Sequence, residues 1–183
     1  MIIGVTGMLG AGKGAIVEYL VSKKGFAHYS ARDFIVKEAA KRGLTINRDT
    51  MTAVANDLRE NFGPGYIVQQ LIERALNEGG DAVIESVRTL GEIDILKSHA
   101  GTLLFGVNAN PKIRYERIKK RGSETDNVDY EKFLSDEARE DNNTDPTKAN
   151  LSRCLQLSDV VFDNSGTIEE LYAKVETALS SIH

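Results

Sequence analysis

The chain has 183 residues, of which 41% are hydrophobic and 27% charged, and its formal net charge is −4. A chain of this length can bury a full hydrophobic core without a structural metal or a disulfide. Its single cysteine excludes an intramolecular disulfide and any Cys-x-x-Cys metal site. The acidic balance argues against sequence-independent binding to nucleic acid or an anionic membrane, and no apolar stretch approaches about 18 residues. We therefore expect a cytoplasmic protein, whose oligomeric state the sequence leaves open.

Short apolar runs, typical of buried strands, alternate along the chain with segments of helical spacing. The predicted strands cover residues 2–5, 26–29, 82–84, 102–107 and 160–162. The predicted helices cover residues 13–23, 51–62, 67–75, 111–121, about 130–140 and 167–182, and the last begins with a capping box. This alternation predicts an α/β fold with three layers, in which helices cover both faces of a five-stranded parallel sheet. In such sheets ligands bind beyond the carboxyl ends of the strands.

A glycine-rich segment follows the first predicted strand directly. Its sequence, Gly7-Met8-Leu9-Gly10-Ala11-Gly12-Lys13-Gly14, matches the phosphate-loop pattern G-x-x-x-x-G-K. Glycines let successive main-chain N–H groups point at one phosphate, and the lysine reaches the β- and γ-phosphates. We expect the nucleotide to contact Gly7, Gly10, Ala11, Gly12, Lys13, Gly14 and Ala15. A glycine-rich turn with a solvated lysine is the alternative.

The position after the loop lysine departs from the usual pattern. It holds Gly14, followed by Ala15, where a serine or threonine hydroxyl usually binds Mg²⁺. Bound Mg²⁺ should therefore be held mainly by nucleotide phosphates, waters and a more distant carboxylate.

Charged residues also follow the third predicted strand. Glu85 stands at the strand end, where a carboxylate can order the water shell of Mg²⁺, and Arg88 can bind a phosphate with its forked guanidinium. We predict that Glu85 binds the metal ion and the substrate. We predict that Arg88 binds the substrate and acts in catalysis. An ordinary salt bridge in a loop is the alternative.

Three further residues are candidates for binding the phosphate acceptor. Arg32 and Asp33 follow the second strand, and Asp33 could accept a hydroxyl proton or bond to a sugar. Ser30 could instead cap a helix that has Asp33 in its first turn. Arg59 lies beside the apolar stripe of its helix, at a margin from which it could turn toward a pocket; a solvated arginine is the alternative.

The helix that begins at Pro111 carries three arginines at related positions. Arg114, Arg117 and Arg121 have the spacing i, i+3 and i+7 of one helix face. Facing a triphosphate, they would stabilise charge on the transferring phosphoryl group. We expect Arg114 and Arg117 to contact the nucleotide and Arg117 and Arg121 to act in catalysis. Solvated residues that complement the helix dipole are the alternative.

The segment 122–147 is acidic and poor in large apolar residues. We predict a small mobile lid that excludes water when it closes. A plain helical hairpin is the alternative.

These features together resemble the nucleoside-monophosphate-kinase-like group of P-loop NTPases. The segment Glu85-Ser86-Val87-Arg88-Thr89 is similar to Asp-Gly-Phe-Pro-Arg-Thr of adenylate kinases, shortened by one residue, and residues 158–171 resemble the end of dephospho-CoA kinases. The likeness spans nearly the whole length. It implies one kinase-like domain over residues 1–183, with an acceptor-binding helical region at 30–78 and the lid at 122–147.

The resemblance also implies an activity. With ATP as donor and Mg²⁺, the protein would transfer the γ-phosphoryl group in line to a small acceptor, most simply a nucleoside or deoxynucleoside monophosphate. The alternatives are a dephospho-CoA kinase and a non-catalytic module that senses nucleotides.

Overall fold

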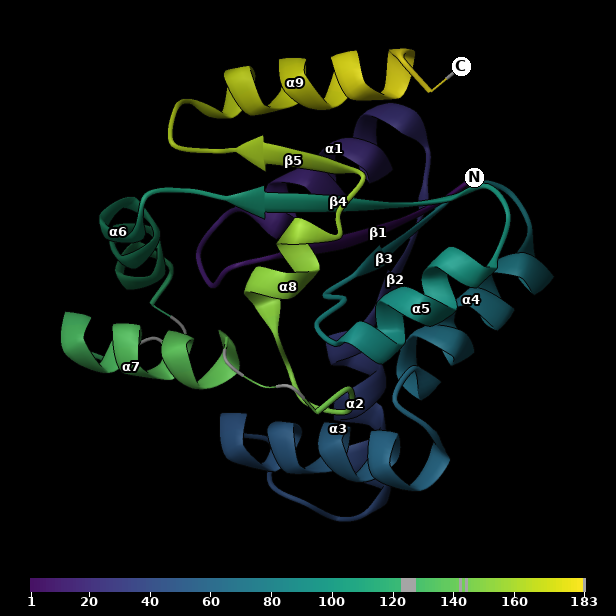
Figure 1. Ribbon diagram of the computed structural model, residues 1–183, viewed down its shortest axis with the longest axis vertical. Helices are drawn as coiled ribbons and strands as arrows, with labels where there is room; N and C mark the ends of the chain where they lie inside the picture. Colours follow the sequence, from purple (N-terminus) through teal and green to yellow (C-terminus); the bar gives the residue numbers. More distant parts are fainter. Residues whose placement is uncertain (123–127, 142, 144, 183) are drawn as a thin grey trace.

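The first predicted strand forms the centre of the sheet. The computed structural model describes residues 1–122, 128–141, 143 and 145–182. β1 (Ile2–Gly7) lies between β3 (Ala82–Glu85) and β4 (Thr102–Asn108), while β2 (Ala27–Ser30) and β5 (Val160–Asp163) form the edges. All four pairings are parallel. The carboxyl ends of the strands therefore meet at one edge, on the left in Figure 1, while both chain termini lie toward the right.

The register of the sheet determines which strand ends are neighbours. Glu85 at the end of β3 pairs with Val5 of β1 on one side and with Ser30 of β2 on the other. Strands β2 and β3 lie on one side of β1, and β4 and β5 lie on the other. The chain crosses β1 between β3 and β4, so the strand order changes direction at this central strand. Such a switch point is where parallel sheets bind ligands.

Nine helices are described around and beyond the sheet. They are α1 (Lys13–Lys24), α2 (Ala31–Lys41), α3 (Arg48–Phe62), α4 (Tyr66–Glu78), α5 (Leu90–Ser98), α6 (Pro111–Arg121), α7 (Tyr130–Asp141), α8 (Leu151–Gln156) and α9 (Ile168–Ser180). Helices α6 and α7 lie beyond the carboxyl ends of β4 and β5 in Figure 1. The predicted three-layer fold with five parallel strands is confirmed.

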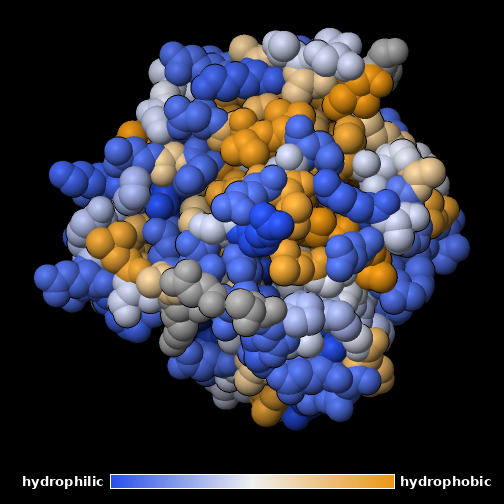
Figure 2. Space-filling view, in the orientation of Figure 1, coloured by the Kyte–Doolittle hydropathy of each residue, from blue (hydrophilic) through white to orange (hydrophobic). Residues whose placement is uncertain are grey.

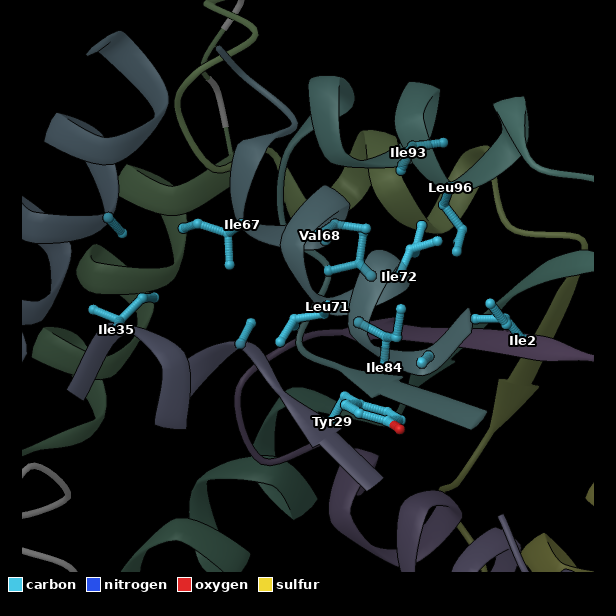
Figure 3. Packing of buried hydrophobic residues seen from close by; sticks show 14 of the residues in the cluster. Ile2, Tyr29, Ile35, Ile67, Val68, Leu71, Ile72, Ile84, Ile93 and Leu96 are labelled. Atoms are coloured by element: carbon cyan, nitrogen blue, oxygen red, sulfur yellow. The ribbon is translucent and has the colours of Figure 1, made fainter. Parts of the chain in front are cut away.

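Two clusters of buried hydrophobic residues hold the layers together. One joins the sheet to α2, α3, α4 and α5, and in Figure 3 its side chains from α4 and α5 meet those of β3. The other joins β1 and β4 to α1 and α9. Because β1 contributes Ile2 to the first cluster and Ile3 and Val5 to the second, it is buried on both faces. This burial explains its continuous apolar sequence.

Helix α5 is not among the helices predicted from the sequence. Helix α5 begins with a capping box in which the Thr89 side chain accepts from the Glu92 main chain and the Glu92 side chain accepts from the Thr89 main chain. The pattern Thr-x-x-Glu before Ile93 and Leu96 was available as a signal. The capping box predicted for the last helix, Thr167 with Glu170, is confirmed.

The surface is polar on the side where the strands end. Figure 2 shows hydrophilic residues over the region of α6 and α7, whereas hydrophobic residues gather across the middle of this face. Within the described part of the chain, no helix combines the length and apolarity needed to cross a bilayer.

Candidate functional site

The loop from β1 to α1 has a backbone that requires glycine at two central positions. Gly10 and Gly12 have φ values of +75° and +106°. A Cβ at Gly10 would lie 2.5 Å from the Arg114 carbonyl oxygen, and one at Gly12 would clash with Nδ2 of Asn164. The loop therefore curls in a left-handed conformation while α6 and the segment after β5 press against it.

The amino end of α1 lacks the side-chain cap that most other helices have. Ser30, Thr89 and Thr167 cap α2, α5 and α9 with their hydroxyls, but the N-cap of α1 is Gly12, with no side-chain hydrogen bond. The N–H groups of the first turn of α1 are therefore not capped by a side chain. Together with the positive end of the helix dipole, they suit an anion.

Lys13 folds back over this loop. Its Nζ donates to the carbonyl oxygens of Gly7 at 2.7 Å and Met8 at 3.0 Å. The ammonium group is thus held beside the same main-chain curl that presents the amides. Curl, helix end and lysine together have the composition of a phosphate-binding loop.

A hollow of about 220 Å³ lies beside the loop and is lined by both polar and apolar residues. It is lined by Gly12, Ala15, Arg117, Asn164 and Ile168. The side chain of Asn164 is fixed, because its buried Nδ2 donates to the Ala11 carbonyl at 2.8 Å. The buried Nη1 of Arg117 has no hydrogen-bond partner among the described residues. Sequence analysis missed Asn164, although its place directly after the fifth strand was a signal.

The three arginines of α6 do not share one environment. Arg114 is buried, and its Nε donates to the Ala109 carbonyl at 2.9 Å while its Nη1 donates to the Leu9 carbonyl at 3.2 Å. Both Nη atoms also bond to the Glu137 carboxylate of α7. In contrast, Arg117 lines the hollow and Arg121 is exposed. Arg114 therefore ties the loop to α7, and its expected contact with a nucleotide stays a prediction.

Glu85 is the last residue of β3, which lies beside β1, and Arg88 lies on the connection that follows, whose backbone is unusual. Glu85 Oε2 is 3.0 Å from Nε2 of His28. The next residue, Ser86, has a φ of +74°, the only positive value of a non-glycine residue in the described chain. The N–H groups of Ser86 and Val87 both donate to the Val5 carbonyl. The strand end is thus fixed beside the phosphate loop in a conformation that is strained for serine.

Arg59 lies in the interior and not at the margin predicted from its helix. Its side chain is 5% exposed, and its Nε and Nη2 donate to Oε1 of Glu92 at 2.9 and 2.7 Å. Oε2 of Glu92 accepts from the main-chain N–H of Arg88 at 2.8 Å. Sequence analysis missed Glu92. The buried ion pair links α3 to the connection that carries Arg88.

Burial also determines the protonation state of Cys154, the single cysteine of the chain. Desolvation, with the nearby Glu92 carboxylate, raises the pKa of the Cys154 thiol to about 12. The thiol therefore stays protonated at neutral pH, as expected of a small core residue and not of a nucleophile.

The remaining acceptor candidates lie at the start of α2. Ser30 caps this helix by accepting from the Asp33 N–H at 3.1 Å, as the capping interpretation predicts. The side chains of Arg32 and Asp33 are exposed. Capping leaves both side chains accessible at the end of β2.

The helix expected within the lid is present as α7, but it is docked on its neighbours. Phe133 is fully buried and packs near the Tyr115 ring, 5.6 Å between centroids. Asp136 lies 3.6 Å from Arg48 of α3, and Glu137 binds Arg114. Residues 123–127, 142 and 144 of the predicted lid lie outside the described residues. Among those that are described, no group of three or more His, Cys, Asp or Glu residues could hold a metal ion.

Known proteins share this fold. Residues 3–146 match the model of a family described as AAA domain. A UPF0200 protein of Staphylothermus marinus is 32% identical over 171 residues, 93% of this chain and 87% of that protein. Among solved structures, TT1252 from Thermus thermophilus matches with a TM-score of 0.64 at 18% identity, over 100% of this chain and 98% of that one. Shikimate kinase from Acinetobacter baumannii, in complex with shikimate, matches with a TM-score of 0.57 at 16% identity, over 98% and 93%. The two structural matches establish a P-loop kinase-like fold.

Proposed function

The chain belongs to the AAA domain family and to the UPF0200 proteins, and we propose that it is an ATP-dependent kinase that phosphorylates a small, nucleotide-type acceptor. The observation that carries this proposal is the phosphate loop, which follows β1 at the switch point of the sheet. Arg88 is held beside it, on the connection that follows the neighbouring strand β3. A phosphoryl donor on one side and an anionic acceptor on the other would meet beyond the end of β1.

The donor side of the site suits ATP. The amides of residues 10–14 and the ammonium group of Lys13 would bind the polyphosphate, and the nucleoside would occupy the hollow beside Arg117 and Asn164. Bound ATP supplies the phosphoryl group and a leaving group that needs charge stabilisation. Lys13 and Arg117 would provide that charge at fixed positions, which is the main contribution a protein makes to phosphoryl transfer.

A magnesium ion fits this site only with few protein ligands. No hydroxyl stands at Gly14 or Ala15, and Glu85 is the carboxylate at the neighbouring strand end, paired with His28. Glu85 would hold Mg²⁺ through its water shell, with nucleotide phosphates as the direct ligands. When bound, the ion would neutralise charge on the phosphates.

The acceptor would lie near the ends of β2 and β3. Arg88 would bind an acidic group of the acceptor, while Arg32 and Asp33 contact it from the start of α2. A nucleoside or deoxynucleoside monophosphate is the first candidate. A dephospho-CoA kinase remains the second, with a ribose hydroxyl as acceptor, because the last strand and helix carry that likeness.

A panel assay tests the proposal. ATP and Mg²⁺ are incubated with nucleoside monophosphates, deoxynucleoside monophosphates and dephospho-CoA, and products are separated by chromatography. We expect transfer to one acceptor to be faster than ATP hydrolysis, and Lys13→Ala to slow this transfer about 100-fold or more. Tight binding of an ATP analogue with no transfer to any acceptor would favour the nucleotide-sensing module, which the absence of the loop hydroxyl supports.

Arg88→Ala separates the two halves of the site. We expect a higher acceptor KM or a lower kcat with nearly unchanged ATP affinity, because Arg88 lies on the β3 side. Arg74→Ala, which removes an exposed arginine of α4, is the control. Equal loss of ATP binding in Arg88→Ala would contradict this assignment.

A further inference from the structure

The buried carboxylate of Glu92 binds two different arginines through its two oxygens. Oε1 accepts from Nε and Nη2 of the Arg59 side chain. Oε2 accepts from the main-chain N–H of Arg88 at 2.8 Å and more weakly from that of Thr89 at 3.3 Å. The Glu92 side chain is 0% exposed, so water does not compete for these bonds.

The main chain of Arg88 is held on both sides by partners distant from it in the fold. Its N–H binds Glu92 in α5, and its carbonyl accepts from the Asn150 N–H at the start of α8, 3.0 Å away. Two residues earlier, Ser86 has its left-handed backbone pinned to Val5. This stretch therefore has little freedom to adjust to a ligand.

Stability alone gives a poor reason for the ion pair. Replacing a buried ion pair by apolar residues of similar volume is often neutral or stabilising, because two charges must be desolvated. An apolar pair, however, could not accept the hydrogen bond that the Glu92 carboxylate accepts from the main-chain N–H of Arg88. The geometry therefore favours a role in placing Arg88.

We propose that Glu92 is a positioning residue that fixes the main chain of Arg88 at the edge of the acceptor site and retains Arg59 in the core. Arg59 then adds no net charge to the ligand site, because Glu92 balances its guanidinium. The anionic group of the acceptor meets Arg88 and not an Arg59–Arg88 clamp. The role in catalysis rests on the proposed kinase function, whereas the placement of the Arg88 main chain does not.

Two matched double variants test the proposal. Arg59→Met/Glu92→Gln and Arg59→Met/Glu92→Leu both remove the buried charges, so neither leaves an ion without a partner. Only the Gln variant keeps an oxygen that can accept from the Arg88 N–H. Amide hydrogen exchange at Arg88 is measured by NMR relative to the Ile3 amide in the centre of the sheet. Global destabilisation accelerates both amides, but loss of positioning accelerates Arg88 alone.

We expect exchange at Arg88, relative to Ile3, to rise about tenfold or more in the Leu variant, since losing a hydrogen bond to a charged group costs at least that much. In the Gln variant we expect a clearly smaller rise, because its neutral oxygen keeps a weaker hydrogen bond to the Arg88 N–H. Equal exchange at Arg88 in the two variants would overturn the proposal. Should one of them fail to fold, Glu92→Gln and Glu92→Leu, each combined with Arg59→Leu, give the same comparison.

A kinetic comparison then tests the catalytic role. With the acceptor identified by the panel assay, we expect acceptor KM to rise about tenfold in the Leu variant, with little change in the Gln variant or in ATP KM. A purely structural role predicts equal acceptor KM values in both. An ATP analogue that fails to bind wild type would refute the kinase function, yet the exchange data would still decide whether Glu92 positions Arg88.

Discussion

On the β1 side of the carboxyl edge, the groups that suit a ligand come from one continuous stretch of sequence, Gly7–Gly14, with glycine where the backbone requires it. On the β3 side, Arg88 is held by Glu92 of α5 and by Asn150, the N-cap residue of α8. Glu92 is in turn held by Arg59 of α3. The first half of the site is built locally and leaves a helix end without a side-chain cap. The second half depends on a buried ion pair between elements far apart in the chain. Damage to the first should affect function, and damage to the second should affect folding as well.

The largest effect on folding should come from breaking the buried pair on one side only. We expect Arg59→Met to lower the free energy of unfolding by about 3–5 kcal/mol, because it leaves the Glu92 charge uncompensated in the interior. Urea denaturation measures this. Lys148→Met, which removes a pair with the half-exposed Glu60, should change stability by less than about 1 kcal/mol. Similar losses in both would remove the distinction between the two halves.

The next effect concerns the loop lysine. We expect Lys13→Ala to lower kcat about 100-fold or more, while the circular dichroism spectrum and unfolding midpoint stay close to wild type. Lys24→Ala, at the other end of α1, removes a surface pair with Glu176 and is the matched control. If Lys13→Ala unfolds the protein, the loop is not the locally built region that we describe.

A smaller effect, on nucleotide affinity, should follow from a substitution of Asn164, which lines the hollow beside the loop. Asn164→Ala leaves the Ala11 carbonyl without its 2.8 Å hydrogen bond. Since an unsatisfied buried group costs about 1–3 kcal/mol, we expect the Kd of an ATP analogue to rise about tenfold by loosening the loop. Isothermal titration calorimetry measures this, with Asn61→Ala on the surface of α3 as control. An unchanged Kd would exclude a role for Asn164 in shaping the loop.

The smallest effect is a dependence of stability on pH that arises outside both halves of the site, at Glu78 of α4 and Glu176 of α9. Glu78 has a lowered pKa because of hydrogen bonds from Arg74 and then Tyr29, and Glu176 has one because of Lys24 and then Tyr19. Each carboxylate therefore adds stability above the ordinary pKa of 4.5, and that stability is lost as pH falls through the lower folded value. Glu78→Gln and Glu176→Gln should each be slightly less stable than wild type at pH 7, and urea denaturation should show this difference disappearing in strong acid. A difference that persists there would exclude linkage to these carboxylates.

Much of the architecture could be predicted because its signals are local. The apolar run of β1, the glycine-rich loop and the capping box of α9 each lie within a few residues, and all form as predicted. Helix α5 was missed because it has only nine residues, which is too short for its helical period to stand out. Its capping box, Thr89 with Glu92, is nevertheless a local signal in the sequence.

The environments of the arginines could not be predicted in the same way. Helical spacing placed Arg114 with Arg117 and Arg121, and Arg59 beside an apolar stripe, but spacing does not say which acidic residue arrives from elsewhere. Glu137 on α7 engages Arg114, and Glu92 on α5 engages Arg59. A guanidinium bound by a buried carboxylate contributes to the fold, whereas Arg117, whose Nη1 has no partner in the described chain, lies on the wall of a hollow.

The sequence by itself determined the α/β class, the order of most elements and the phosphate loop, since these depend on periodicity, glycine dihedral freedom and a lysine fixed next to them in the chain. Only the tertiary structure decided which arginines are neutralised and which line the site. The physical reason is that a charge in the interior is governed by the nearest opposite charge in space, and for Arg59 and Arg114 that charge comes from another helix.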